Sequence, residues 1–153
     1  MGFPEFNKIR MIKFFNKEEE ARIVAAIRQA ESGTSGEIRV HLEKHHKGTA
    51  LEEAARVFHQ LGMGKTEARN GVLLFIAPEQ KTFAILGDQG INAVVPPDFW
   101  KEERDLIQTH FRQGAFCEGI CLAVGQVGEK LKIHFPVKSD DINELPDEIS
   151  YGS

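Results

Sequence analysis

Four oxygen-bearing side chains stand at the ends of segments that the sequence predicts to share one edge of a sheet. Glu37 opens one predicted strand, Asn70 precedes a second, Asp88 follows a third, and Asp98 lies in the next loop. Parallel strands bring their starting ends together, and a hairpin returns the end of the third strand to the same edge. Carboxylate and amide oxygens are the ligands that calcium and magnesium prefer. The pattern therefore predicts a site for a divalent metal, Ca2+ or Mg2+.

Each of the four residues also has an ordinary structural role open to it. Asp98 could cap the helix that follows it, while Asn70 and Asp88 could make turns. Glu37 could simply lie on the exposed face of its strand. Gly87 and Gly90 would allow the backbone to approach an ion closely, but glycine is equally common in turns. Both interpretations stay open on these residues alone.

Other recognisable chemistries fail on spacing. The segment 64–66 (GKT) matches only the end of a phosphate-binding P-loop, because His59 stands where the motif needs glycine. Counting twelve residues from Asp88 places Phe99 where a calcium-binding EF-hand needs glutamate. No G-x-S-x-G motif is present, so no catalytic residue is assigned. His41, on the predicted outer face of a strand, is expected to be solvated.

We expect the two cysteines to serve core packing. Cys117 and Cys121 are four positions apart in a predicted helix, where their side chains do not face each other well enough for an easy disulfide. With no histidine or further cysteine at a suitable spacing, the pair is also a poor zinc motif. We therefore expect two buried thiols.

Periodicity and capping signals define the elements of the first half. Asn16 is followed by three glutamates and an apolar stripe, which predicts a helix ending near Gly33. Residues 37–43 alternate between polar and apolar, which is typical of a strand with one wet face. Thr49 and Glu52 form a capping box for a second helix, which ends by residue 62.

The second half adds a hairpin and two helices. Residues 71–77 form a nearly continuous apolar run, and residues 82–86 return beside it after a short turn. Trp100 begins a helical pattern that Gly114 closes, and a longer pattern runs from Phe116 to His134. This order predicts an α/β fold: a three-layer α/β/α sandwich with a small mixed sheet and helices on both faces.

Length and charge limit the possible functions. The 153 residues fit one domain, which we place at 16–135 between an N-terminal leader (1–15) and an acidic, disordered tail (136–153). The tail carries the whole net charge of -4, so the body is formally neutral. A neutral body offers no basic field for nucleic acid, and no segment is long and apolar enough to span a membrane. We expect a cytoplasmic monomer.

Several segments together resemble the TPM domain, a family that includes a thylakoid-lumen acid phosphatase, a photosystem II repair protein and a receptor modulator. The resemblance spans about residues 16–135 and is carried by TSGEIRV (34–40), RNGVLL (69–74), GDQGIN (87–92), FRQGAF (111–116) and EGI (118–120). It implies an α/β/α sandwich and divalent-metal binding at the acidic loops, with phosphatase activity in some members. By the motif match, Asp88 and Asp98 are the leading ligands, followed by Asn70 and Glu37.

Three functions follow as hypotheses. The first is a metal-binding accessory module, since four oxygen donors converge without a recognisable nucleophile. The second is a metal-assisted phosphatase acting on phosphate monoesters, for which Arg69 is a candidate phosphate clamp. The third is a protein-interaction module that presents Phe99 and Trp100, although a tryptophan at a helix start more commonly buries its ring.

Overall fold

The computed structural model of the chain describes residues 14–137 and 145–152. Its helices are α2 (Lys17–Glu31), α3 (Ala50–Gln60), α4 (Gln89–Asn92), α5 (Lys101–Arg112) and α6 (Phe116–His134), with short 3-10 turns η1 (Met63–Lys65) and η2 (Pro78–Gln80). Its strands are β1 (Glu37–Leu42), β2 (Gly71–Ala77), β3 (Thr82–Gly87) and β4 (Ser150–Tyr151). Each helix and strand predicted from the sequence is therefore present.

The four strands form one mixed sheet in the order β3-β2-β1-β4. β1 runs parallel to β2 with Glu37 opposite Gly71, and β2 runs antiparallel to β3 with Val72 opposite Gly87. This register confirms the predicted parallel pair and hairpin. It brings the starts of β1 and β2 and the end of β3 to one edge of the sheet.

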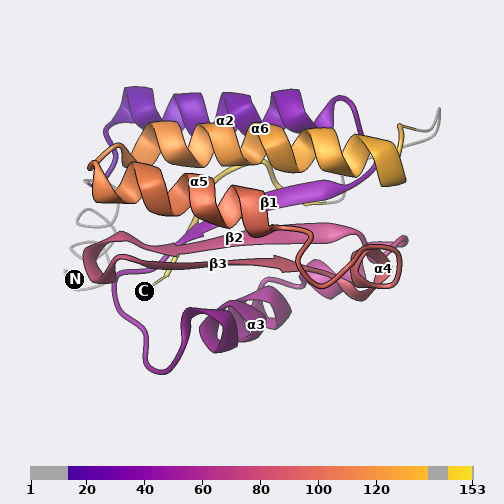
Figure 1. Cartoon of the computed structure of the whole chain (residues 1–153), viewed down its shortest axis with the longest axis horizontal. Coiled ribbons are helices and arrows are strands. Elements are labelled where there is room, and N and C mark those ends of the chain that lie inside the picture. The colour runs from indigo at the N-terminus through magenta and orange to yellow at the C-terminus, as the bar shows by residue number, and fades with distance from the viewer. Residues whose placement is uncertain (1–13, 138–144, 153) are drawn as a thin grey trace, which may run out of the picture.

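Helices cover both faces of the sheet, as predicted. Figure 1 shows α2, α5 and α6 on one face and α3 on the other. Two buried clusters fill the layers between helices and sheet, the larger under α2, α5 and α6 and the smaller under α3. β2 is buried along its whole length because it lies in the sheet interior between both helical layers. The fold is a three-layer α/β/α sandwich.

The predicted helix starts carry the expected caps. The side chain of Asn16 accepts a hydrogen bond from the Glu19 amide, and Glu19 bonds back to the Asn16 amide. Thr49 and Glu52 make the same reciprocal pair at the start of α3. Both capping boxes satisfy amides that a helix start otherwise leaves unpaired.

The predicted wet face of β1 is mostly buried, with only Arg39 partly exposed on it. Glu37, His41 and Glu43 all lie on that face, and each is less than 7% exposed. The prediction was wrong because alternation reports which side chains are polar, whereas burial depends on what else packs there. In this fold the end of the chain runs along β1 and covers these side chains.

The chain ends also differ from prediction. Phe15, assigned to the leader, is buried in the larger core cluster and stacks edge-on with Phe14. In the assigned tail, Leu145 is buried and Ser150 and Tyr151 pair with β1 as β4. The prediction of a disordered tail is therefore wrong for residues 145–152. Residues 1–13, 138–144 and 153 lie outside the described part.

Two further expectations concern apolar segments. Trp100 is buried, and Phe99, which packs against it, is half-buried, so neither ring is presented to a partner as an exposed anchor. Among the described helices, none is long and apolar enough to cross a bilayer.

Candidate functional site

Asp88 is a buried carboxylate at the junction of β3 and α4. Its backbone amide donates to the Gly71 carbonyl at 2.9 Å, which fixes it beside the start of β2. Its side chain caps α4, with Oδ1 accepting from the Gln89 amide at 2.7 Å. Only 6% of the residue is exposed. The turn role that the sequence left open for Asp88 is thus present, and the carboxylate also carries a charge that burial makes costly without a partner.

Arg69 supplies the positive partner. Its Nε and Nη2 atoms donate to the two carboxylate oxygens of Asp88 at 2.8 and 3.0 Å, a bidentate pair. This hydrogen bonding raises the pKa of the Arg69 guanidinium above its usual value. The Arg69 side chain remains 40% exposed, and its backbone has a positive φ of 50°, which is uncommon for a residue with a Cβ. The cation is therefore at the surface while the anion is inside.

Asn70, the next residue in the chain, has a buried side-chain amide nitrogen. The residue is 2% exposed, and its Nδ2 has no hydrogen-bond partner among the described residues. The hydroxyl of Thr66, in the same loop, is also buried without a partner there. A buried polar group left unpaired costs about 1–3 kcal/mol, so such groups often mark a place where a ligand or water binds.

The same loop also brings backbone carbonyl oxygens close to α4. The Gly90 amide donates to the Arg69 carbonyl at 2.9 Å. A Cβ at Gly90 would collide with the carbonyl oxygens of Ala68 and Arg69, so glycine is required for α4 to pack against the loop. The Asp88 carboxylate, the Asn70 amide and these two carbonyls therefore come from two segments in direct contact. We call residues 66–70 together with 88–90 the loop cluster.

Glu37 is at the same sheet edge, where its backbone amide donates to the Asn70 carbonyl at 3.3 Å, but its carboxylate has a different partner. Gly71 lies between β1 and β3 there, and two strand spacings place the flanking backbones about 10 Å apart. The side chains of Met63 and Leu145 pack over Gly71, within 4 Å of where its Cβ would stand. Glu37 Oε1 instead accepts the Leu145 amide at 2.7 Å. Its expected place on an exposed face was wrong.

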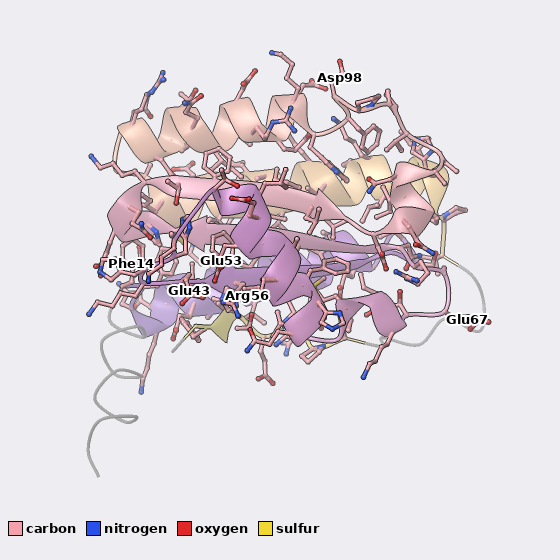
Figure 2. All side chains as sticks on the ribbon, turned by 90° about the horizontal axis from the view of Figure 1, so that it is seen from below. Phe14, Glu43, Glu53, Arg56, Glu67 and Asp98 are labelled. Carbon is pink, nitrogen blue, oxygen red and sulfur yellow. The ribbon has the colours of Figure 1, made fainter. Side chains whose placement is uncertain are left out.

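Asp98 lies outside the loop cluster, on a separate segment of the chain. It is exposed in the loop before α5, at the rim of the molecule in Figure 2. It does not cap that helix with its side chain, because the N-cap of α5 is Trp100; only the Asp98 carbonyl takes part, accepting from Lys101. Within the described ranges, no group of three His, Cys, Asp or Glu side chains is arranged to hold a metal ion.

The TPM domain family matches residues 10–130 of the chain. The chain belongs to the TPM domain family.

Solved structures agree with this membership. The BA42 protein of the psychrophilic bacterium Bizionia argentinensis is 51% identical, with a TM-score of 0.85 over 91% of this chain and 96% of that one. The N-terminal domain of a P. gingivalis protein has a TM-score of 0.65 at 21% identity, covering 79% of this chain and 78% of its own. The N-terminal domain of the cg2496 protein of Corynebacterium glutamicum has a TM-score of 0.60 at 14% identity, covering 76% and 73%. The last two support the fold alone. No functionally curated protein matches this TPM domain.

Sequence reasoning missed two features of this TPM domain. It considered Arg69 only as a phosphate clamp, although an arginine directly before Asn70 could have been expected to reach the same sheet edge as Asp88. It also missed a buried chain of hydrogen bonds in which His41 bridges Ser150 and Glu43, each at 2.9 Å. No local signal could have found that chain, because Ser150 is 109 positions from His41.

The cysteines offer no reactive group. Both thiols are free, Cys117 buried and Cys121 half-buried. Burial raises the pKa of Cys121 to about 12 and also raises the pKa of Cys117. Neither thiol is therefore ionised at neutral pH, as expected for cysteines that serve packing.

Proposed function

We propose that this TPM domain binds a divalent cation, Ca2+ or Mg2+, at the loop cluster, with the Asp88 carboxylate as the principal ligand. The Asn70 amide oxygen and the carbonyls of Ala68 and Arg69 would complete a set of hard oxygen donors, together with water. We leave Glu37 out of this set, because its carboxylate accepts the Leu145 amide and the side chains of Met63 and Leu145 pack over Gly71, which lies between β1 and β3. Asp98 is at most a peripheral ligand, since it lies in an exposed loop.

The observation that carries the proposal is the Arg69–Asp88 pair. A buried carboxylate that is neutralised by a partly exposed cation can exchange that cation for another without leaving a charge unpaired. The unpartnered amide of Asn70 gives an independent indication that the loop cluster accepts a ligand. Amide oxygen and nitrogen can exchange places by a flip of the side chain, so Asn70 can present its oxygen to an ion.

The first prediction follows from competition between Arg69 and the metal. Calcium or magnesium titration of metal-stripped protein, followed by amide NMR, should shift the signals of residues 66–70 and 88–92. Asp88→Asn should weaken binding at least about 10-fold, because it removes the charged ligand. Arg69→Gln should strengthen binding, because it removes the competing guanidinium. Asp98→Asn should have a smaller effect than Asp88→Asn.

Asp105→Asn is the matched control, because Asp105 is an exposed carboxylate that pairs with Lys101 on the same helix. It should leave the titration unchanged. A flat titration of the wild-type protein at millimolar metal would contradict the proposal. So would an Arg69→Gln variant that binds no better than wild type while remaining folded.

A metal-assisted phosphatase is the second candidate, and the same ion pair favours it. A metal that takes the Asp88 carboxylate releases the Arg69 guanidinium, a donor suited to phosphate oxygens. Hydrolysis of p-nitrophenyl phosphate should then require the metal and decrease in both Asp88→Asn and Arg69→Gln, although the two variants change metal affinity in opposite directions. Turnover that is unaffected in both variants would have to come from a contaminant or another site.

A further inference from the structure

Residues 145–152, here called the C-terminal strap, lie along the outer edge of β1. The strap begins at Leu145, which is 8% exposed and belongs to the smaller core cluster together with Met63. At the other end the Gly152 amide donates to the Leu42 carbonyl at 2.8 Å. The TPM family match ends at residue 130, so the strap lies beyond the matched segment.

A first line of contacts joins the strap to Asn70 of the loop cluster through Glu37. The Leu145 amide donates to Glu37 Oε1 at 2.7 Å. The Glu37 amide in turn donates to the Asn70 carbonyl at 3.3 Å. Asn70 is also the residue whose buried side-chain nitrogen has no hydrogen-bond partner among the described residues. One residue therefore stands between the strap and a proposed ligand of the cation.

A second line of contacts joins the strap to Asp88 through Gly71. The Leu145 Cδ1 atom is 3.8 Å from the place where a Cβ of Gly71 would stand. The Cε and carbonyl oxygen atoms of Met63 are each 3.5 Å from the same place. The Gly71 carbonyl accepts the Asp88 amide at 2.9 Å. The residue that Leu145 covers is therefore hydrogen-bonded to the residue that carries the principal ligand.

These contacts change the free-energy cost of binding a cation. A site whose ligands are already held in place binds more tightly than one that must be ordered during binding. With Leu145 docked, the backbones of Asn70 and Asp88 are both held at the sheet edge. With Leu145 released, the packing that it shares with Met63 over Gly71 is lost. The cation should therefore bind the docked state more tightly than the released state.

We propose that the C-terminal strap regulates the cation site: the docked strap raises the affinity of the loop cluster for Ca2+ or Mg2+, and the bound cation holds the strap on β1. This inference rests on the proposed function, because it concerns the same cation site. Linkage makes the coupling reciprocal, so each partner stabilises the other by the same factor. Such couplings typically change affinity by about 5- to 150-fold.

Calcium titration of the full chain, followed by amide NMR, compares the wild type with two variants at Leu145. Leu145→Ala removes the side chain that covers Gly71 and should weaken Ca2+ binding at least about 5-fold. Leu145→Met keeps an apolar side chain of similar volume there and should bind within about twofold of the wild type. Leu122→Ala is the matched control, the same truncation at a 44% exposed position of α6, and should leave the affinity unchanged.

Hydrogen exchange gives two readouts that a purely local packing role would not move. In wild-type protein, saturating Ca2+ should raise the protection of the Gly152 amide, at the end of the strap farther from the loop cluster. The increase should match the factor by which Leu145→Ala weakens binding. In metal-free protein, Leu145→Ala should lower the protection of the Asp88 and Gly90 amides, which bond to backbone carbonyls at the sheet edge. The Gly119 amide, in the first turn of α6, should keep its protection.

The outcomes separate this regulation from the cation site itself. If the wild type binds Ca2+ and Leu145→Ala binds it equally well, the regulation is overturned and the cation site stands. The regulation is also overturned if Leu145→Met binds as weakly as Leu145→Ala, or if saturating Ca2+ leaves the protection of the Gly152 amide unchanged. That last measurement uses wild-type protein, so it decides even if Leu145→Ala does not fold. A flat titration of the wild type would overturn both proposals.

Discussion

Lys130 of α6 shows how much a single side chain can organise in this molecule. Its Nζ atom lies 2.9 Å from Glu103 and 3.4 Å from Glu102, both on α5, and it donates to the Phe99 carbonyl. It also lies 4.8 Å from the centre of the Phe99 ring. Glu103 is 1% exposed, so Lys130 provides the charge that allows a carboxylate to be buried between these helices.

Removing this charge should be costly. Lys130→Met should lower the free energy of unfolding by about 3 kcal/mol, because it leaves the Glu103 carboxylate buried without its partner. The double variant Lys130→Met/Glu103→Leu should recover most of the loss, since no charge then remains buried. Urea denaturation of the wild type and the two variants provides the measurement. A single variant as stable as wild type would show that Glu103 is satisfied by other groups.

Single residues of the loop cluster were predicted better in position than in environment. The sequence placed Asp88 and Asn70 at one sheet edge because strand direction follows from the helix and hairpin connections. It could not predict that Arg69 would pair with Asp88, since this depends on a side-chain path within a loop. It also could not predict that Glu37 would accept the Leu145 amide, because Leu145 is 108 positions away in the sequence.

At the scale of elements, small residues make a close contact between two helices. α2 and α6 pack together where Gly128 faces Ala30, and a Cβ on Gly128 would stand 2.6 Å from the Ala30 Cβ. Gly125, one turn earlier on α6, has open space instead. The two glycines therefore differ in packing while sharing one helix.

This difference predicts opposite effects of one substitution. Gly128→Ala should destabilise the protein by about 1–2 kcal/mol, because overpacking exceeds the gain in helix propensity. Gly125→Ala should stabilise it by roughly 0.5–1 kcal/mol, since only the propensity term applies. Thermal unfolding followed by circular dichroism would measure both. The packing argument fails if Gly128→Ala is as stable as Gly125→Ala.

The elements themselves were predictable where local signals were strong. Capping boxes at Asn16 and Thr49 fixed two helix starts, and the apolar run of β2 indicated a strand inside the sheet. β4 was not predicted, because two residues carry no periodicity and its pairing depends on β1. For the same reason the polar face of β1 was taken as wet.

At the scale of the whole molecule, the layered architecture was predictable from element order, whereas the ends of the chain were not. The order of helices and strands allows few arrangements that bury every apolar face. Composition alone suggested that the acidic end stays free. Its attachment depends on individual contacts, such as Tyr151 with Glu20 and Leu145 with Glu37, that lie far apart in sequence.

The sheet order β3-β2-β1-β4 has a consequence for how the protein is made. A growing chain can pair β1, β2 and β3 from residues 37–87, but β4 is supplied by residues 150 and 151. During synthesis β1 is therefore an edge strand until residues 150 and 151 have been made. Unpaired edges attract other chains, so a stalled or truncated product that ends before residue 145 should be more prone to aggregate than a chain that includes β4.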